Sequence, residues 1–167
     1  MQTVGAYLRR GIKIGIGTDT FPHNMIEEMR SALYTSRLMA RDPFDLRTSD
    51  IFDAATLGGA AVLQRDDIGR LEKGAKADLV MVDVTNPSIR PVRDPIRSMV
   101  YAAAERGVRH VFVGGNQVVN DGEVTTLDIA AASAALEEAQ RRLEPGVQDL
   151  EAVPPGNLAT RLPAHFT

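Results

Sequence analysis

The sequence predicts an α/β fold in which a β/α segment is followed by a region of short strands. Three observations support this prediction. A predicted helix over residues 4–10 leads directly into an apolar segment, residues 12–17, as in an αβ unit of a parallel sheet. Two further helical patterns follow, over residues 25–40 and 49–63. From about residue 66 to 122 the pattern changes to short apolar runs separated by turns.

The composition is that of an ordinary globular chain. The chain has 167 residues, of which 44% are hydrophobic and 25% charged, and its net charge is -3. Because nucleic-acid binding needs a basic face, nothing here indicates it. No apolar run approaches the roughly 18 residues of a membrane helix, and no signal peptide is evident. Cysteine is absent, which excludes disulfides and thiolate ligands and fits a cytoplasmic protein.

The first β/α segment has recognisable boundaries. Thr3 is predicted to cap the helix over residues 4–10, and Gly11 to end it. The alternation of Ile12, Ile14 and Ile16 then predicts a strand that runs to Gly17 and stops at Asp19.

The next helix is predicted over residues 25–40. Asn24 is its expected N-cap, with Glu27 at the third helical position in a variant of the capping box. Ile26, Met29 and Leu33 form an apolar stripe, and Pro43 prevents the helix from continuing.

A further helix is predicted over residues 49–63, with Thr48 as its cap. Its centre, Leu57 to Ala61, contains only small residues after the leucine. Each glycine in a helix costs about 1 kcal/mol relative to alanine. The usual compensation is the close approach of another backbone, so we expect this helix to pack tightly against a neighbour.

The second half of the chain predicts strands and two more helices. Residues 79–82 form an apolar strand, and residues 111–113 and 117–119 a β-hairpin around Gly114-Gly115. A helix is predicted over residues 96–106, and another from the cap Asp128 to Leu143.

The last of these helices carries charges at supporting spacings. Glu137 with Arg141, and Glu138 with Arg142, are predicted i,i+4 pairs. The tail from 144 to 167 contains four of the nine prolines and is predicted to be extended or partly disordered.

Asp19 is the leading candidate for chemistry. A carboxylate placed directly after an apolar strand can ligate a metal or accept a proton, and catalytic residues of β/α barrels sit at such strand ends. The alternative is a structural role, in which Asp19 is a turn residue that accepts hydrogen bonds from backbone amides. No neighbouring residue completes a catalytic site.

Four stretches in this order resemble the C-terminal part of the metal-dependent amidohydrolase superfamily, in its cytosine deaminase, chlorohydrolase and aminohydrolase branch. They are Gly15 to Asp19, the helical residues 27–30 and 54–61, the segment Ile68 to Val80, and the hairpin region Val111 to Gly122. The resemblance covers about residues 4–130.

The resemblance implies an organisation for the chain. Residues 1–65 would be the last β/α unit of a TIM-like (β/α)8 barrel, and residues 66–125 strands of a small β-sandwich. Residues 126–167 would form a C-terminal helix and an extended tail. The fold would be incomplete relative to the family, since seven barrel strands are missing.

The resemblance also implies a reaction. In the family, a bound divalent metal, Zn or Fe, activates a water that hydrolyses a non-peptide C–N or C–Cl bond of a small molecule. Asp19 would contact the metal and accept the proton. His23 and Thr20, in the loop that follows, are the candidate substrate contacts. A solvated loop histidine is the alternative for His23.

The chain departs from the family in its ligands. It contains no His-x-His pair, and His23, His110 and His165 do not stand at family ligand positions. A catalytic zinc normally has three protein ligands, so one carboxylate does not hold it. We therefore expect a divalent metal in the full-length parent, none held by this chain alone, and no activity from the chain alone.

Two interpretations remain open. One is an enzyme fragment completed by a complementary barrel half. The other is a non-catalytic folded remnant that self-associates into a homo-oligomer or docks on a partner, because a strand taken from a barrel has unpaired edges. Met1 would fall inside the helix before the eighth strand, which fits an internal start or a fragment.

Overall fold

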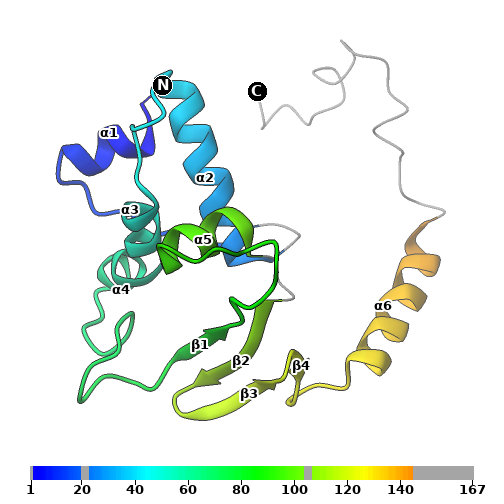
Figure 1. Ribbon diagram of the computed structural model, residues 1–167. Coiled ribbons are helices and arrows are strands. Elements are labelled where there is room, and N and C mark those ends of the chain that lie inside the picture. Colours follow the sequence, from blue (N-terminus) through cyan, green and yellow to red (C-terminus); the bar gives the residue numbers. More distant parts are fainter. Residues whose placement is uncertain (1, 20–22, 104–106, 145–167) are drawn as a thin grey trace. The chain divides into compact units, whose positions relative to one another are not determined.

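The computed structural model describes residues 2–19, 23–103 and 107–144 (Figure 1). The chain divides into two compact units, Met1–Thr126 and Leu127–Thr167. None of the described helices is long and apolar enough to cross a membrane.

The first unit begins with two capped helices, both as predicted. Helix α1 spans Val4–Arg9, and the Thr3 hydroxyl accepts a hydrogen bond from the Ala6 amide. Helix α2 spans Met25–Ala40, and the Asn24 side chain accepts from the amides of Ile26 and Glu27. These side chains satisfy amides that have no partner within the helix.

The third helical region has three parts and a different cap from the one predicted. It consists of α3, Thr48–Asp53, a π-helical turn η1, Ala54–Gly58, and α4, Gly59–Val62. The prediction of Thr48 as the cap is wrong, because Thr48 is already helical and Arg47 is the N-cap. The Asp50 carboxylate accepts from the Arg47 amide at 3.1 Å and from its guanidinium at 2.8 Å, which starts the helix one residue earlier.

The predicted strand over residues 12–17 is not formed. The segment is extended, but in the described part of the chain no strand pairs with it. A strand is defined by ladder hydrogen bonds to a neighbour, so an alternating apolar pattern without a neighbour gives only extended backbone. Two backbone hydrogen bonds anchor the segment, from the Ile12 amide to the Tyr7 carbonyl at 3.2 Å and from the Ile16 amide to the Ala54 carbonyl at 3.3 Å.

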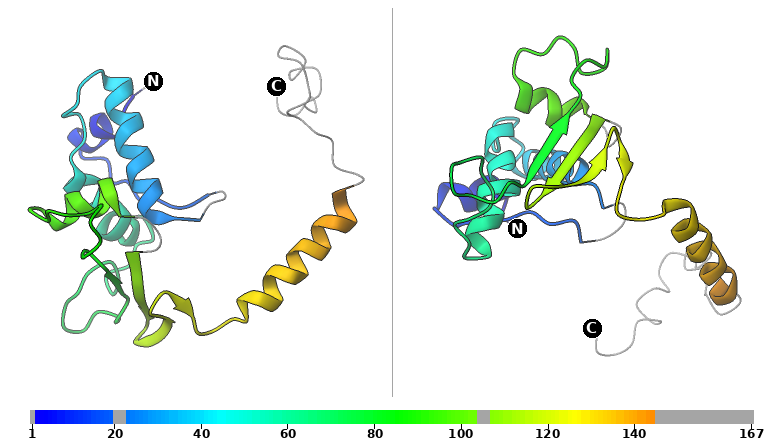
Figure 2. Two further views of the ribbon diagram at one scale, coloured as in Figure 1. Left: turned by 45° about the vertical axis from the view of Figure 1, so that its right-hand side comes forward. Right: turned by 90° about the horizontal axis from the view of Figure 1, so that it is seen from below.

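The strands lie side by side in one small antiparallel sheet of order β1-β2-β3-β4 (Figure 2). Their bounds are Leu79–Val82, Val108–Val113, Asn116–Asn120 and Glu123–Val124. The predicted hairpin is confirmed, with Val111 opposite Val119 and both turn glycines at positive φ. One sheet is described, whereas a sandwich needs two that face each other, so the sandwich stays a prediction.

The core of the first unit lies where α2, α3 and α5 pack together (Figure 1). Helix α5 spans Pro95–Ala102, shorter than predicted, and residues 104–106 lie outside the described part. Two arginines of α2 form hydrogen bonds to neighbouring elements. Arg30 donates to the Val100 and Ala103 carbonyls. Arg37 donates to the Leu46 carbonyl and the Tyr101 hydroxyl. The buried apolar residues are Ile26, Met29, Leu33, Leu46, Ile51, Ile89, Val100 and Ala103.

The second unit contains helix α6, Ile129–Leu143, capped as predicted by Asp128, which accepts from the Ala131 amide at 2.9 Å. No residue of α6 is buried. The predicted i,i+4 pairs are wrong, because Arg141 pairs with Glu138 at i,i+3 and 2.9 Å. Positions three and four apart are both neighbours on a helix, so either pairing satisfies the arginine. The predicted tail falls on residues 145–167, outside the described part.

Candidate functional site

The candidate site is built on the extended segment between α1 and α2. Gly11, at a φ of 75°, ends α1 by adopting a left-handed conformation that other residues rarely take. The chain then runs extended through residues 12–19. Ile12 remains 46% exposed, so the start of the segment is not part of the core, whereas Ile16 packs against it.

The segment is positioned by close backbone contact with the small-residue helix, as the sequence predicted. A Cβ atom at residue 58 would lie only 2.1 Å from the Ile14 carbonyl oxygen. A Cβ at residue 15 would lie 3.1 Å from the Gly59 Cα. Only glycine permits this approach.

The π-helical turn η1 provides the acceptor for the same contact. The Ala54 carbonyl, at the start of the turn, accepts from the Gly59 amide and also from the Ile16 amide. π-Bulges of this kind are frequent at functional sites, where they alter the local geometry of a helix. Here the turn holds the strand-like segment that ends at Asp19.

Asp19 lies at the far end of this segment and is exposed. Within residues 2–19, 23–103 and 107–144, no group of three or more histidine, aspartate or glutamate side chains could hold a metal. Catalytic zinc needs about three protein ligands, so the described residues do not by themselves fit the metal that the resemblance implies. Asp19 can supply a single carboxylate.

The other candidate residues are placed only in part. His23 is exposed and directly precedes Asn24, whose buried side chain caps α2. Thr20 lies outside the described residues. The His110 ring, on β2, contacts the Gln117 side chain and accepts from the Asp121 amide at 3.2 Å, which is a structural role.

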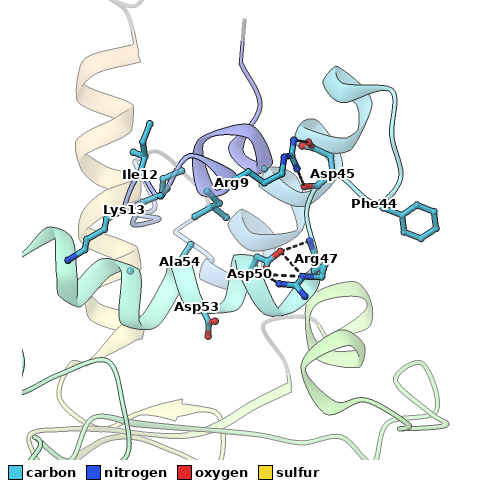
Figure 3. Close-up of a pocket in the computed structure, with 14 residues that line it drawn as sticks. Arg9, Ile12, Lys13, Phe44, Asp45, Arg47, Asp50, Asp53 and Ala54 are labelled. Atoms are coloured by element: carbon cyan, nitrogen blue, oxygen red, sulfur yellow. Dashed lines mark hydrogen bonds and ion pairs between the residues drawn. The ribbon is translucent and has the colours of Figure 1, made fainter.

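A hollow of about 590 Å³ lies at the opposite end of the extended segment (Figure 3). Its wall includes Ile12 and Ile14 but neither Asp19 nor His23. Asp19 is five residues beyond Ile14, roughly 16 Å along an extended chain. The hollow is therefore separate from the candidate site. It is lined by Gly5, Leu8, Arg9, Gly11, Ile12, Lys13, Ile14, Phe44, Asp45, Arg47, Asp50, Asp53, Ala54 and Gly58.

A buried carboxylate beside this hollow fixes α1 against α2. Asp45 is 6% exposed, accepts from the Ser36 hydroxyl at 2.7 Å and pairs with Arg9 at 2.6 Å (Figure 3). Burial raises the pKa of Asp45, but hydrogen bonds from Arg9, Ser36 and Thr3 outweigh it and hold the pKa below the ordinary 3.8. These residues share no sequence motif, which is why sequence reasoning missed them.

Comparison with known proteins identifies a family. The model of the amidohydrolase family matches residues 1–118. A 5-methylthioadenosine/S-adenosylhomocysteine deaminase from Natronomonas pharaonis is 42% identical over 142 residues, which cover 83% of this chain and 32% of that protein. A 5'-deoxyadenosine deaminase from Methanopyrus kandleri is 35% identical, over 77% of this chain and 31% of its own length.

Solved structures agree with these relatives. A zinc-bound adenosine deaminase from Xanthomonas campestris has a TM-score of 0.80 and 32% identity, over 84% of this chain and 33% of that one. A variant of atrazine chlorohydrolase from Arthrobacter aurescens, complexed with zinc and atraton, has a TM-score of 0.72 and 25% identity, over 81% and 31%. The chain thus spans about a third of the length of the proteins it matches.

The close contact at Gly58 predicts a sharp difference between two neighbouring substitutions. Gly58→Ala should destabilise the fold by about 1–3 kcal/mol, because its methyl group would overlap the Ile14 carbonyl. Gly59→Ala is the matched control, since its Cβ would meet nothing closer than the Ala54 carbonyl at 3.9 Å. Equal unfolding free energies in urea for the two variants would contradict this account of the docking contact.

The Asp45 network predicts a pH-dependent contribution to stability. Because the folded-state pKa of Asp45 is lowered, its contribution is present above pH 4 and disappears as the pH falls through the folded-state value. Asp45→Asn should therefore lower the unfolding free energy at pH 7, and the gap to the wild type should narrow toward pH 3. Asp53→Asn, at an exposed carboxylate, serves as the control. A difference in unfolding free energy between the wild type and Asp45→Asn that is constant with pH would refute the role assigned to Asp45.

Proposed function

Because this chain belongs to the amidohydrolase family, we propose that it is the C-terminal part of a metal-dependent deaminase that acts on an adenosine-type nucleoside. The observation that carries the proposal is the 42% identity to a 5-methylthioadenosine/S-adenosylhomocysteine deaminase over 142 residues. The proposed reaction replaces the amino group of the base with an oxygen from water and releases ammonia. Nucleoside deaminase names on several relatives favour a C–N bond over the C–Cl alternative.

The proposed architecture follows the family. Residues 12–17 would be the eighth strand of a (β/α)8 barrel, with α2 and the α3–η1–α4 region as the helices after it. The alternation of Ile12, Ile14 and Ile16 and the close contact of the segment with the small-residue helix support this. The sheet β1–β4 would be one wall of the small sandwich.

In this architecture Asp19 is proposed to contact the metal and to accept a proton. A carboxylate can do both, and the segment holds Asp19 at its end by the contacts at Gly15 and Gly58. His23 and Thr20 are proposed to contact substrate from the loop that follows. Since His23 is exposed, a ligand can reach it.

The metal ligands are the part that this chain does not provide. Asp19 alone does not fit a zinc site, and the described residues offer no cluster to complete one. The remaining ligands are proposed to come from the two thirds of the family architecture that the chain does not span. The 167-residue chain by itself is then proposed to be inactive and free of stoichiometric metal.

A chimeric enzyme tests this function. In the Natronomonas pharaonis deaminase, the matching region would be replaced by that of this chain. The chimera should bind about one zinc per chain and deaminate 5-methylthioadenosine. Asp19→Asn should lower kcat by about 10²–10⁴-fold with an unchanged melting temperature, because a proton acceptor is lost.

Controls separate the parts of the proposal. Asp53→Asn, another exposed carboxylate, should leave kcat unchanged, and His23→Ala should act mainly on KM. Wild-type turnover in a folded, zinc-loaded Asp19→Asn chimera would remove Asp19 from the mechanism. Turnover or stoichiometric zinc in the 167-residue chain alone would show that the chain is sufficient.

A further inference from the structure

Helix α6, taken within its own unit, presents an apolar stripe that its neighbours in that unit leave exposed. Ile129, Leu136 and Leu143 stand seven residues apart and are 49%, 71% and 68% exposed. No residue of the helix is buried. Large aliphatic side chains at one spacing on one face normally mark a surface that another element covers.

The stripe has the spacing of a two-helix seam with alternating residue size. Ala132 and Ala139 lie between the three large residues, so large and small side chains follow one another at intervals of three and four. These two alanines are also the only half-buried residues of α6. Glu138 and Arg141 form their ion pair away from this seam, as the polar face of an amphipathic helix does.

We propose that α6 pairs antiparallel with α6 of a second copy of this chain. In that orientation Ile129 of one copy lies against Ala139 of the other, and Leu136 against Ala132. Every inner layer then combines one large and one small side chain, which lets the two helices approach to about 8 Å. A parallel pair would stack alanine on alanine and leave those layers empty.

Charge complementarity favours the same orientation and the same occupant. Asp128 and Arg142 lie on one flank of the seam, at opposite ends of the helix. Arg141 is engaged by Glu138, whereas Arg142 has no carboxylate at salt-bridge distance in the described residues. An antiparallel pair places Arg142 of each copy beside Asp128 of the other, and a parallel pair brings no opposite charges together on that flank.

The proposal does not rest on the proposed deaminase function, because its evidence is the stripe and the charges of α6 alone. The surface is proposed to bind a second copy of the chain. The first unit, residues 145–167 and an unrelated partner are the competing occupants that the experiment distinguishes.

Sedimentation of the 167-residue chain measures the association. We expect a dimer at micromolar concentration, and Leu136→Glu should raise its dissociation constant at least about 100-fold, because both copies place a charge in the seam. Ala134→Glu adds the same charge on the outer face and should leave the dimer unchanged. Circular dichroism confirms that both variants keep α6 helical.

Disulfide formation tests the orientation, since the chain has no cysteine of its own. In the antiparallel pair, Ala135 of one copy faces Ala135 of the other, so Ala135→Cys should oxidise to a covalent dimer, and outward-facing Ala134→Cys should not. A monomer at 100 µM, or a dimer that Leu136→Glu leaves intact, would overturn the proposal.

Discussion

The close backbone contact between residues 14–16 and the small-residue helix is the constraint on which the candidate site depends. The segment has no strand neighbours in the described chain, so its course is set by this contact, by backbone hydrogen bonds from Ile12 and Ile16, and by the packing of Ile16 on the core. Gly58 has a conformational cost in a helix, and the 2.1 Å contact explains why alanine does not replace it, whereas the contact at Gly15 is tight. The π-helical turn adds a carbonyl that accepts twice. Asp19 is positioned because the helix positions the segment.

A second constraint fixes the positions of the surrounding helices. Asp45 is buried and charged, and three hydroxyl or guanidinium donors from α1, its cap and α2 converge on it. A buried charge without partners is strongly unfavourable, so these residues are interdependent. On the other side of α2, Arg30 and Arg37 bind carbonyls of α5 and of the segment before α3. Helix α2 thus connects the part that carries Asp19 with the part that leads to the sheet.

Sequence reasoning succeeded where the signal is local and failed where it depends on partners. The caps Thr3, Asn24 and Asp128 were predicted correctly, because a capping side chain acts within three residues of itself. The prediction of a strand over residues 12–17 was wrong, because strand formation depends on neighbouring strands that the sequence pattern does not reveal. The Asp45 network was missed for the same reason, since Arg9 and Asp45 are 36 residues apart. The N-cap position of Arg47 could have been found from Asp50, which stands three residues later and forms the capping box with it.

The candidate site shows the same contrast between local features and features that depend on partners. Asp19 is a candidate because a carboxylate that ends an apolar alternation is a local pattern, and its role stays a prediction. Its proposed metal role cannot be local, because a metal needs ligands from several elements, and the described residues contain no group of three or more that could hold one. The family match provides the missing context, since the relatives are about three times as long as the matched region. The described residues therefore hold one carboxylate in place by local contacts, and in the proposed function its chemistry would depend on ligands that these residues do not supply.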